Sequence, residues 1–588
     1  MSADHFPNLW GEGALFAFSG MDGPTDTLSQ FVATFAAERY GLLIHTPRRR
    51  LLDVTLAEDG DVRIAAGDVL AVDTPRGALV IAYAAWHTLV GALPEGARVG
   101  LRFEDEDFTA ETQRTQRTDK SVESVQSVDE NYGNALVLRV SGDRFALAYG
   151  CTVDQAEARA AEGLRADVGQ CVKDRLRLYA SFSTDSTDLN GFLSVESVQS
   201  VENYARLLKK CVSVMRVNTL APEGVIATRW STPDRAPHRH MWLWDSVFHT
   251  CAMNHLDADL AWEFLQAVLD RQQPDGMIPH MMQVTGRVSA ITQPPLLAWG
   301  VWENFRVTGN KDRLAYALPH MERYLDWNAR HRDQNGNGLL EWFIEENETC
   351  RSGESGLDNS QRFDAAILLD AVDFSVFQAR DMSYVARIAE ALGEADKAAH
   401  WRARAAALSR AIHETLWDEA DGFYYDRDMQ GVASSIKAVT GFLPLLLDDL
   451  PPERVPRLVA HLQAPREFGA ALPIPSMALD TPNWSTDMWR GATWINMNYL
   501  VVEGLRKHGQ STVAQAIVDA TLYHVNKYYQ QYGVIFEFYD AKDERPPVDC
   551  DRKGPNRKPY NLRVKMDSIR DYHWSAALTA KWLLDARF

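Results

Sequence analysis

The sequence predicts two domains of different classes, an N-terminal antiparallel β-sandwich over residues 1–200 and a C-terminal helical toroid over residues 201–588. Up to about residue 180, short apolar runs alternate with polar residues between Gly and Asp turns, which is typical of strands. From about Glu202 onward, apolar residues recur every three or four positions, which is typical of helices. The helical segments share no fixed sequence period, and this favours a closed toroid over a solenoid of repeats.

Two pairs of apolar runs in the N-terminal region predict β-hairpins. Residues 51–56 and 62–66 lie on either side of an Asp- and Gly-containing turn, and residues 135–140 and 145–149 lie on either side of another. Hairpins of this kind are the units of an antiparallel sandwich.

A polar stretch from Thr109 to Glu130 interrupts these runs and is predicted to be a flexible loop. It contains the octapeptide SVESVQSV at residues 121–128, which recurs at residues 194–201. Two copies are too few for a repeat architecture, so we interpret the pair as a chance or duplicated linker-like segment.

About twelve amphipathic helical segments follow, mostly in antiparallel pairs with short loops. Residues 260–269, for example, place their apolar side chains on one face behind a candidate cap at Asp257, and residues 401–416 repeat the pattern. The region lacks the regular strand alternation that a β/α barrel requires. In a toroid the long loops would carry the function.

Composition excludes several classes of function. The formal net charge of −19 argues against a nucleic-acid partner, which needs clustered Lys and Arg. No apolar run approaches the roughly 20 residues that span a bilayer. The six Cys residues form no C-x-x-C pair, and the first residues lack a basic segment followed by an apolar one, so we expect a cytoplasmic protein without a disulfide framework.

Tryptophan is concentrated in the helical half, where 15 of the 17 Trp residues follow residue 205. A single Trp is more often a core residue than a ligand contact, and a Gly-flanked Asp is more often a turn residue than an acid. Aromatic rings beside carboxylates nevertheless suit a sugar, and cleavage of a glycosidic bond needs two carboxyl groups. The loops that combine these residue types are 238–246, 353–360, 488–494 and 533–539.

The amino-acid sequences of these segments resemble those of a known family. In order along the chain they read STPDRAPHRHMWLWDSVFH, ESGLDNSQRFD, WRGATWINMNYL and FEFYDA. They resemble glycoside hydrolase family 63 with its bacterial α-glucosidase and glucosylglycerate or mannosylglycerate hydrolase members, and more distantly the trehalases. The resemblance covers about Asn203 to Phe588. It implies an (α/α)6 barrel with the site at its axis and an inverting mechanism.

By position, the resemblance implies that Asp358 is the general acid and Glu537 the general base. An acid that works near neutral pH needs a raised pKa, which burial among Trp residues and Leu357 would provide, whereas the base must stay ionised. For inversion the two carboxyl groups should lie about 6.5 to 9.5 Å apart. The competing candidates are Glu354 for the acid and Glu503, Asp540 or Asp571 for the base.

The same comparison by position predicts the residues that line the sugar subsite. For Arg490 the alternative is a structural ion pair, because a buried guanidinium often only orders a loop. His280 is interpreted as a structural histidine. The predicted substrate-binding residues are Trp242, Trp244, Asp245, Gln293, Trp489, Arg490 and Gly491.

Two residues depart from the family pattern. Leu357 stands where many relatives have Trp, and Gln361 stands where they have Pro. The rim beside the acid is therefore expected to accept a different leaving group.

A calcium-loop pattern occurs between two predicted helices. The spacing D-x-N-x-N-G matches the first six positions of a loop whose alternate oxygens bind Ca²⁺, although its twelfth position is Ile344 instead of Glu. The alternative is an Asx-rich turn. The resemblance favours a structural ion, since some relatives hold Ca²⁺ here. The candidate ligands are Asp333, Asn335, Asn337, Leu339 and Glu341.

These observations favour an inverting, exo-acting α-glycosidase that releases glucose from a small α-glucoside and needs no cofactor for catalysis. The exo character follows from the resemblance alone. The alternative within the class is a glucosylglycerate or mannosylglycerate hydrolase, whose charged leaving group would need cationic side chains at the rim. Two further classes stay open, a non-catalytic carbohydrate-binding scaffold and a polysaccharide lyase, and so does the oligomeric state.

Overall fold

The computed structural model describes most of the chain between Thr34 and Asp585. The described residues are 34–35, 41–46, 50–58, 60–66, 69–85, 87–103, 115–119, 122–129, 134–150, 152–180, 204, 207–208, 210–212, 214–216, 218–220, 222, 224–234, 238, 240–554 and 567–585.

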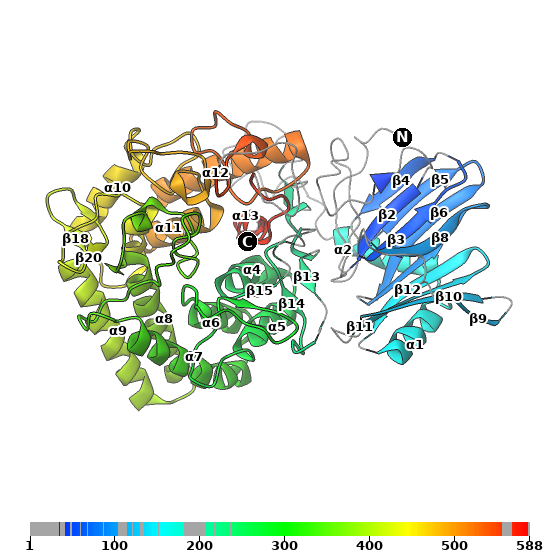
Figure 1. Ribbon diagram of the computed structural model, residues 1–588, viewed down its shortest axis with the longest axis horizontal. Helices are drawn as coiled ribbons and strands as arrows, with labels where there is room; N and C mark the ends of the chain where they lie inside the picture. Colours follow the sequence, from blue (N-terminus) through cyan, green and yellow to red (C-terminus); the bar gives the residue numbers. More distant parts are fainter. Residues whose placement is uncertain are drawn as a thin grey trace.

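Two antiparallel sheets form the N-terminal part (Figure 1). The smaller has the order β1-β2-β3-β8 and the larger the order β4-β5-β6-β7-β12-β11-β10-β9. Buried side chains of both sheets, such as Leu52 and Leu138, belong to one apolar core. The strands are β1 (Thr34–Phe35), β2 (Gly41–Thr46), β3 (Arg50–Thr55), β4 (Asp61–Ala66), β5 (Val69–Thr74), β6 (Gly77–Ala85), β7 (Thr88–Ala92), β8 (Arg98–Phe103), β9 (Thr115–Asp119), β10 (Val122–Asp129), β11 (Asn134–Ser141) and β12 (Arg144–Gly150). The prediction of an N-terminal region of antiparallel sheets is confirmed.

One predicted hairpin is confirmed and the other is wrong. Strands β11 and β12 pair from Ala135 to Ser141 and from Arg144 to Gly150 around the turn at Gly142, which has a φ of 61°. Strands β3 and β4, in contrast, lie in different sheets, since β3 pairs with β2 and β8 whereas β4 pairs with β5. Alternation along each run predicted the strand but carries no information on its partner.

The predicted flexible loop contains two strands. β9 and β10 pair with each other, and β10 continues the larger sheet by pairing with β11, for example Val125 opposite Leu138. The first SVESVQSV copy therefore lies mostly in β10, where its three Val residues suit an extended backbone. The second copy, residues 194–201, lies outside the described residues.

Two helices, α1 (Val153–Gly163) and α2 (Val168–Ala180), correct the prediction that the chain is strand-like up to about residue 180. The side chain of Thr152 caps α1 by accepting the backbone N–H of Gln155 at 3.2 Å. Ala156 and Ala160 of α1 pack against Val137 of the larger sheet. Successive side chains of a strand point to opposite faces, and the neighbouring Leu138 belongs to the core between the two sheets. The helices therefore cover the second face of this sheet.

The described residues of the C-terminal part form helices and, beside them, only short strands. Its helices are α4 (Leu243–Leu256), α5 (Ala258–Leu269), α6 (Leu297–Thr308), α7 (Lys311–His331), α8 (Val372–Ala391), α9 (Ala395–Thr415), α10 (Val455–Gln463), α11 (Ile495–Lys507), α12 (Ser511–Tyr532) and α13 (His573–Asp585). The 3-10 segments are η4 (Gln361–Phe363), η5 (Val439–Leu446), η6 (Pro452–Arg454), η7 (Met488–Arg490) and η8 (Pro547–Asp549). The short strands are β13 (Thr219–Leu220), β14 (Trp230–Ser231), β15 (Met241–Trp242), β16 (Met281–Met282), β17 (Leu369–Asp370), β18 (Trp417–Asp418), β19 (Phe423–Tyr424) and β20 (Arg427–Asp428).

Six of these segments contact one another in a closed ring. In order they are α4, α6, α8, η5, α11 and α13, and α13 returns to α4. Helices α5, α7, α9 and α12 pack against the ring, and in Figure 1 the helices follow an arc beside the sheets. The predicted cap at Asp257 is confirmed, because its Oδ1 accepts the N–H of Leu260 at 2.9 Å. The ring brings loops from distant parts of the sequence to one place.

Within the described part of the chain, none of the helices combines the length and hydropathy that crossing a bilayer would need.

Candidate active site

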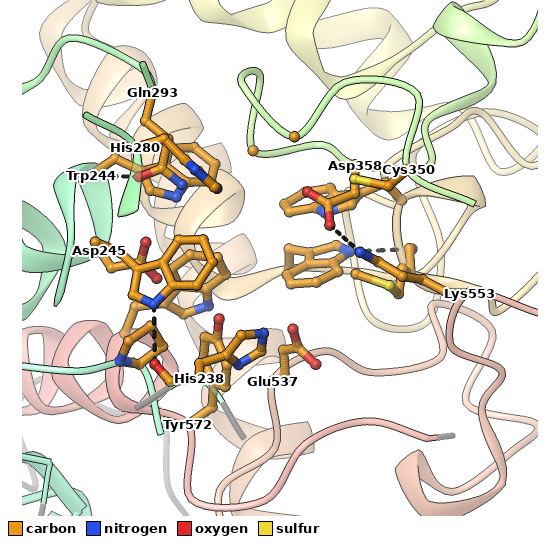
Figure 2. A pocket seen from close by; sticks show the side chains of 18 of the residues that line it. His238, Trp244, Asp245, His280, Gln293, Cys350, Asp358, Glu537, Lys553 and Tyr572 are labelled. Atoms are coloured by element: carbon orange, nitrogen blue, oxygen red, sulfur yellow. Dashed lines mark hydrogen bonds and ion pairs between the residues drawn. The ribbon is translucent and has the colours of Figure 1, made fainter. Parts of the chain in front are cut away.

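A cavity of about 250 Å³ lies where α4, α11 and α13 begin. Figure 2 shows Asp358, Cys350 and Lys553 on one side of it, Gln293, His280 and Asp245 on the other, and Glu537 and Tyr572 below them. Its described lining comprises Pro233, His238, Trp242, Trp244, Asp245, His280, Ile291, Gln293, Glu345, Cys350, Gly353, Gly356, Asp358, Met488, Trp489, Trp494, Glu537, Arg552, Lys553, Tyr572 and Trp574.

The two predicted catalytic carboxylates, Asp358 and Glu537, both line this cavity, whereas none of their four competitors is among the described lining residues. Glu354 is buried and bound by Arg332, with distances of 2.7 and 2.9 Å. Asp540 accepts three backbone N–H groups of its own turn. Asp571 pairs with Lys210 at 2.8 Å, and Glu503 pairs with Arg506 on α11. The geometry gives each competitor a structural partner.

Glu537 is fixed by a bidentate contact. Arg552 donates from Nε to Oε2 at 3.0 Å and from Nη2 to Oε1 at 3.1 Å. Both side chains are almost completely buried, with 2% and 3% exposure. A guanidinium fork of this kind fixes the plane of a carboxylate as well as its position.

Asp358 is less buried, with 24% of its side chain exposed, and its Oδ2 lies 2.7 Å from Nζ of Lys553. Burial opposes ionisation of Asp358, but the charge and hydrogen bond of Lys553 prevail and lower its pKa below the usual value. The expectation that burial raises the pKa of this residue is therefore wrong in this structure. The cause is a cation that no feature of the ESGLDNS segment indicates.

Asp245 is the carboxyl group whose pKa is raised in the cavity. Burial is the main cause, and the nearby charges of Glu537, Asp234 and Asp358 add to it. The pKa of Asp245 therefore lies well above its usual value. A protonated carboxyl group can both donate to and accept from sugar hydroxyls.

Trp242, Trp244 and Gln293 line the cavity, as predicted. Oε1 of Gln293 accepts the backbone N–H of Trp244 at 3.2 Å and so ties the loop before α6 to the start of α4. The Trp242 indole donates to the carbonyl of His238 at 3.2 Å. These contacts fix the aromatic wall before any ligand arrives.

Stacked indoles form another wall. The rings of Trp489 and Trp494 are parallel, with centroids 3.7 Å apart, and Trp494 also contacts Trp574 edge-on at 5.9 Å. Trp494 belongs to the predicted site loop 488–494 but is not among the predicted substrate-binding residues, and Trp574 was not predicted. Their segments, 488–494 and the start of α13, are separated by about 80 positions but meet because α11 and α13 are neighbours in the ring.

Two predicted substrate contacts lie outside the cavity. Arg490 binds Asp364 through both terminal nitrogens at 2.8 Å, so the ion-pair interpretation describes it better than a sugar contact. Gly491 adopts a φ of 156° where a Cβ would meet Ser485 O at 2.4 Å. Neither is among the described lining residues. His280, interpreted from the sequence as structural, does line the cavity and packs edge-on against Trp242 at 4.6 Å.

Arg552, Lys553 and Tyr572 are among the polar lining residues that the sequence interpretation missed. Arg552 and Lys553 belong to a polar segment without a motif, and only the fold brings them beside Glu537 and Asp358. Tyr572 precedes α13, and burial first, then Asp245 and Glu537, raise its pKa. The basic composition of segment 552–558 was the one available signal.

The candidate calcium loop contains oxygen donors but is folded as an Asx-rich turn. Oδ1 of Asn335 and Oδ1 of Asn337 accept backbone N–H groups two residues further on, and both amides donate to Asp370. In the described residues, no group of three or more His, Cys, Asp and Glu has metal-binding geometry. Oδ1 of Asp333 and Oε1 of Glu341 are nevertheless buried without a hydrogen-bond partner, which fits an oxygen-preferring cation.

Comparison with known proteins extends this description. A family described as "Mannosylglycerate hydrolase MGH1-like glycoside hydrolase domain" matches residues 238–575, which is more than half of the chain. The mannosylglycerate hydrolase of Thermus thermophilus is 26% identical over 364 residues, covering 48% of this chain and 86% of that protein. An uncharacterized protein of Borreliella burgdorferi is 28% identical over 282 residues, covering 47% of this chain and 57% of that protein.

Solved structures show the same fold. The GH63 mannosylglycerate hydrolase from Thermus thermophilus, crystallised in complex with glucose, superposes with a TM-score of 0.52 at 23% identity and covers 64% of this chain and 100% of that one. The matched residues 238–575 include every lining residue of the cavity except Pro233. The chain therefore belongs to the mannosylglycerate hydrolase MGH1-like glycoside hydrolases.

Proposed function

We propose that this glycoside hydrolase cleaves an α-glycoside whose leaving group carries a carboxylate, with mannosylglycerate and glucosylglycerate as the first candidates. The observation that carries the proposal is the pair of cations, Arg552 and Lys553, that line the cavity beside the two carboxylates. A charged leaving group requires cationic side chains of this kind. A neutral α-glucoside, the substrate favoured from the sequence, would give Lys553 no partner other than Asp358. Named relatives that are mannosylglycerate hydrolases support the same choice.

In the proposed mechanism Asp358 donates a proton to the glycosidic oxygen while Glu537 removes one from the attacking water. Arg552 orients Glu537, and the different surroundings of the two carboxyl groups suit their different roles. Water attacks from the face opposite the leaving group, so the anomeric configuration inverts. The ring from α4 to α13 would then be an (α/α)6 barrel with this site at its axis.

The aromatic walls would hold the sugar ring. Trp242, Trp244 and the stacked Trp489 offer flat faces to its C–H groups, and Asp245 and Gln293 offer hydrogen bonds to its hydroxyls. Because Gln293 and Trp244 are already bonded to each other, little ordering is needed when the substrate enters.

We also propose that the loop from Asp333 to Glu341 binds a structural Ca²⁺. Asp333 and Glu341 would supply carboxylate oxygens, Leu339 its carbonyl, and Asn335 and Asn337 their amide oxygens after turning from the backbone. Asp370, which holds both amides and which the sequence pattern did not indicate, would join them. The ion would stabilise the connection between α7 and α8 without taking part in catalysis.

A matched substrate panel tests the proposed function. Mannosylglycerate and glucosylglycerate are compared with mannosylglycerol and glucosylglycerol, which differ by one carboxylate, and with maltose. We expect kcat/KM for a glycerate glycoside to exceed that for its glycerol counterpart at least about tenfold. NMR of the first-formed sugar should show the β anomer. Equal rates for glycerate and glycerol glycosides, or preferential hydrolysis of maltose, would restore the α-glucosidase interpretation.

A further inference from the structure

The contact between Asp358 and Lys553 favours the ionised form of Asp358, whereas a general acid must be protonated. At 2.7 Å from an ammonium group, Oδ2 of Asp358 is held as a carboxylate, and the pKa is lowered accordingly. A general acid must carry a proton when the glycosidic bond breaks. The free enzyme therefore needs a change of partners before catalysis.

The backbone conformation at Lys553, which Asp487 stabilises by hydrogen bonds, orients the lysine side chain toward Asp358. The φ of 51° at Lys553 is a left-handed conformation that a non-glycine residue adopts only when its surroundings fix it. Asp487 fixes it by accepting the N–H of Lys553 at 2.6 Å and that of Gly554 at 2.8 Å. Asp487 also accepts the amide of Asn359, the neighbour of Asp358, at 3.0 Å. One carboxylate thus holds the acid loop and the lysine segment together.

No second cation replaces Lys553 among the described groups around Asp358. Arg552 is bound to Glu537, and burial lowers the pKa of His280 to about 4, so that this imidazole is neutral at neutral pH. The groups that face Asp358 are Lys553 and Arg552 from segment 551–554, His280 before β16, Cys350 with Glu345 behind it from the same loop, and Asp245 from α4. Displacing Lys553 would therefore leave Asp358 without its main counter-ion.

We propose that the carboxylate of the leaving group displaces Asp358 from Lys553, so that Asp358 takes up a proton only when an anionic leaving group is bound. This partner exchange rests on the proposed function. In a glycoside of the glycerate 2-hydroxyl, the carboxylate is attached to the carbon that bears the glycosidic oxygen. The oxygen that Asp358 must protonate is thus two bonds from the carbon of the carboxylate that Lys553 would bind, which matches an acid and an ammonium group in direct contact.

The proton balance of the exchange is simple. One ammonium group shared by two carboxylates cannot neutralise both. Once Asp358 has left Lys553, burial and the nearby glycerate carboxylate both oppose its ionisation, so it binds a proton from solvent. Asp358 then gives this proton to the glycosidic oxygen as the bond to the anomeric carbon breaks. The oxygen of the attacking water bonds to that carbon while Glu537 takes a proton from it, and Glu537 afterwards releases this proton to solvent, which balances the proton that Asp358 took up. When glycerate leaves, Lys553 returns to Asp358. A neutral leaving group leaves Asp358 paired and ionised, so substrate charge controls the acid itself.

Binding of D-glycerate tests the exchange without hydrolysis. Calorimetry near pH 7 in buffers of different ionisation enthalpy measures the protons taken up, and we expect about one proton per bound glycerate in the wild type. Lys553→Gln should take up far less, because Asp358 has already lost its cation. Lys553→Arg should restore the uptake. Glycerate binding by the wild type without proton uptake would overturn the exchange.

Kinetics give an independent readout on glycerate and glycerol glycosides. In Lys553→Gln we expect the preference for the glycerate glycoside to fall at least about tenfold. The alkaline limb of kcat/KM on the glycerol glycoside should move to higher pH, because removal of the cation raises the pKa of Asp358. Lys397→Gln, an exposed lysine on α9, is the control that should leave both unchanged. Equal loss on both substrates with an unchanged pH profile would contradict the exchange.

The two proposals fail in different ways. A wild type that hydrolyses glycerate glycosides but binds glycerate without proton uptake keeps the proposed function and loses the exchange. A wild type that binds glycerate with proton uptake but hydrolyses no glycerate glycoside keeps the exchange of partners at Lys553 and loses the proposed function.

Discussion

Arg552 donates two hydrogen bonds to Glu537, from Nε at 3.0 Å and from Nη2 at 3.1 Å, inside a site where both residues are buried. Lys in place of Arg keeps the charge but cannot bind a carboxylate bidentately. We expect Arg552→Lys to lower kcat about 100-fold, because a base displaced by an ångström no longer aligns its water. Steady-state kinetics with unfolding curves measure this. Full kcat in a folded Arg552→Lys variant would show that the fork does not position the base.

Gly356 lies against Trp244 in the loop that carries Asp358. Its φ is +72°, and a Cβ would come within 2.3 Å of Cζ2 of Trp244. Gly309→Ala is a matched control, since Gly309 has a φ of +64° with open space around it. Both substitutions should cost about 1 kcal/mol from the left-handed backbone. We expect Gly356→Ala alone also to lower kcat/KM, about tenfold or more, by displacing the indole. Similar activity in both variants would contradict this role of Trp244.

Asp381 makes stability depend on pH. This buried carboxyl group accepts the N–H groups of Ala298 at 2.8 Å and Trp299 at 3.1 Å at the start of α6, yet burial raises its pKa to about 7. Between about pH 4, the unfolded value, and pH 7 the folded protein binds more protons than the unfolded one. Its contribution to the free energy of unfolding therefore falls as the pH rises through this range.

Asp381→Asn should remove the part of the pH dependence of the free energy of unfolding that Asp381 causes. Urea unfolding at pH 5 and pH 8 measures it, and the wild type should lose more stability than the variant between these two values. Parallel pH dependence of the two proteins would show that Asp381 ionises normally in the fold.

The loop from Asp333 to Glu341 should respond to calcium. A cation that binds only the folded state stabilises it by about 3 kcal/mol at a hundredfold excess over Kd. We expect Ca²⁺ to raise the Tm of EDTA-treated protein, and Glu341→Gln to abolish the increase. A Tm that is independent of Ca²⁺ would leave the loop as an Asx-rich turn.

Hydrophobic periodicity predicted the secondary structure of individual segments better than it predicted which strands pair. The β11–β12 hairpin was predicted because its strands are adjacent and joined by a short turn. Strand β10 was missed because the stretch that contains it, Thr109 to Glu130, is rich in Thr, Gln, Ser and Asp and suggested a loop, although β10 pairs with β11. Helix α1 was missed although Thr152 caps it and Ala156 and Ala160 repeat at helical spacing. Pairing across a sheet depends on the fold and not on any one segment.

In the candidate site, too, residues within recognisable motifs were predicted, whereas contacts that depend on the fold were not. Asp358 and Glu537 were predicted because their segments match motifs of the family that the sequence resembles, and both line the cavity. Lys553 and Arg552 lie in a segment without a motif, and their pairing with these carboxylates arises from the closure of the ring. Arg490 was predicted from its place beside Trp489, but its side chain binds Asp364 instead. Chain position alone does not determine which way a side chain points.

Hydrolysis of mannosylglycerate by the wild type, Asp358→Asn and Glu537→Gln tests the central claim most directly. Initial rates of glycerate release are compared for the three proteins, with folding checked by circular dichroism. We predict measurable turnover by the wild type and a loss of at least about 1000-fold in each variant, since each removes one of the two proton transfers. Two folded variants that both retain the wild-type rate would contradict the assignment of the acid and the base.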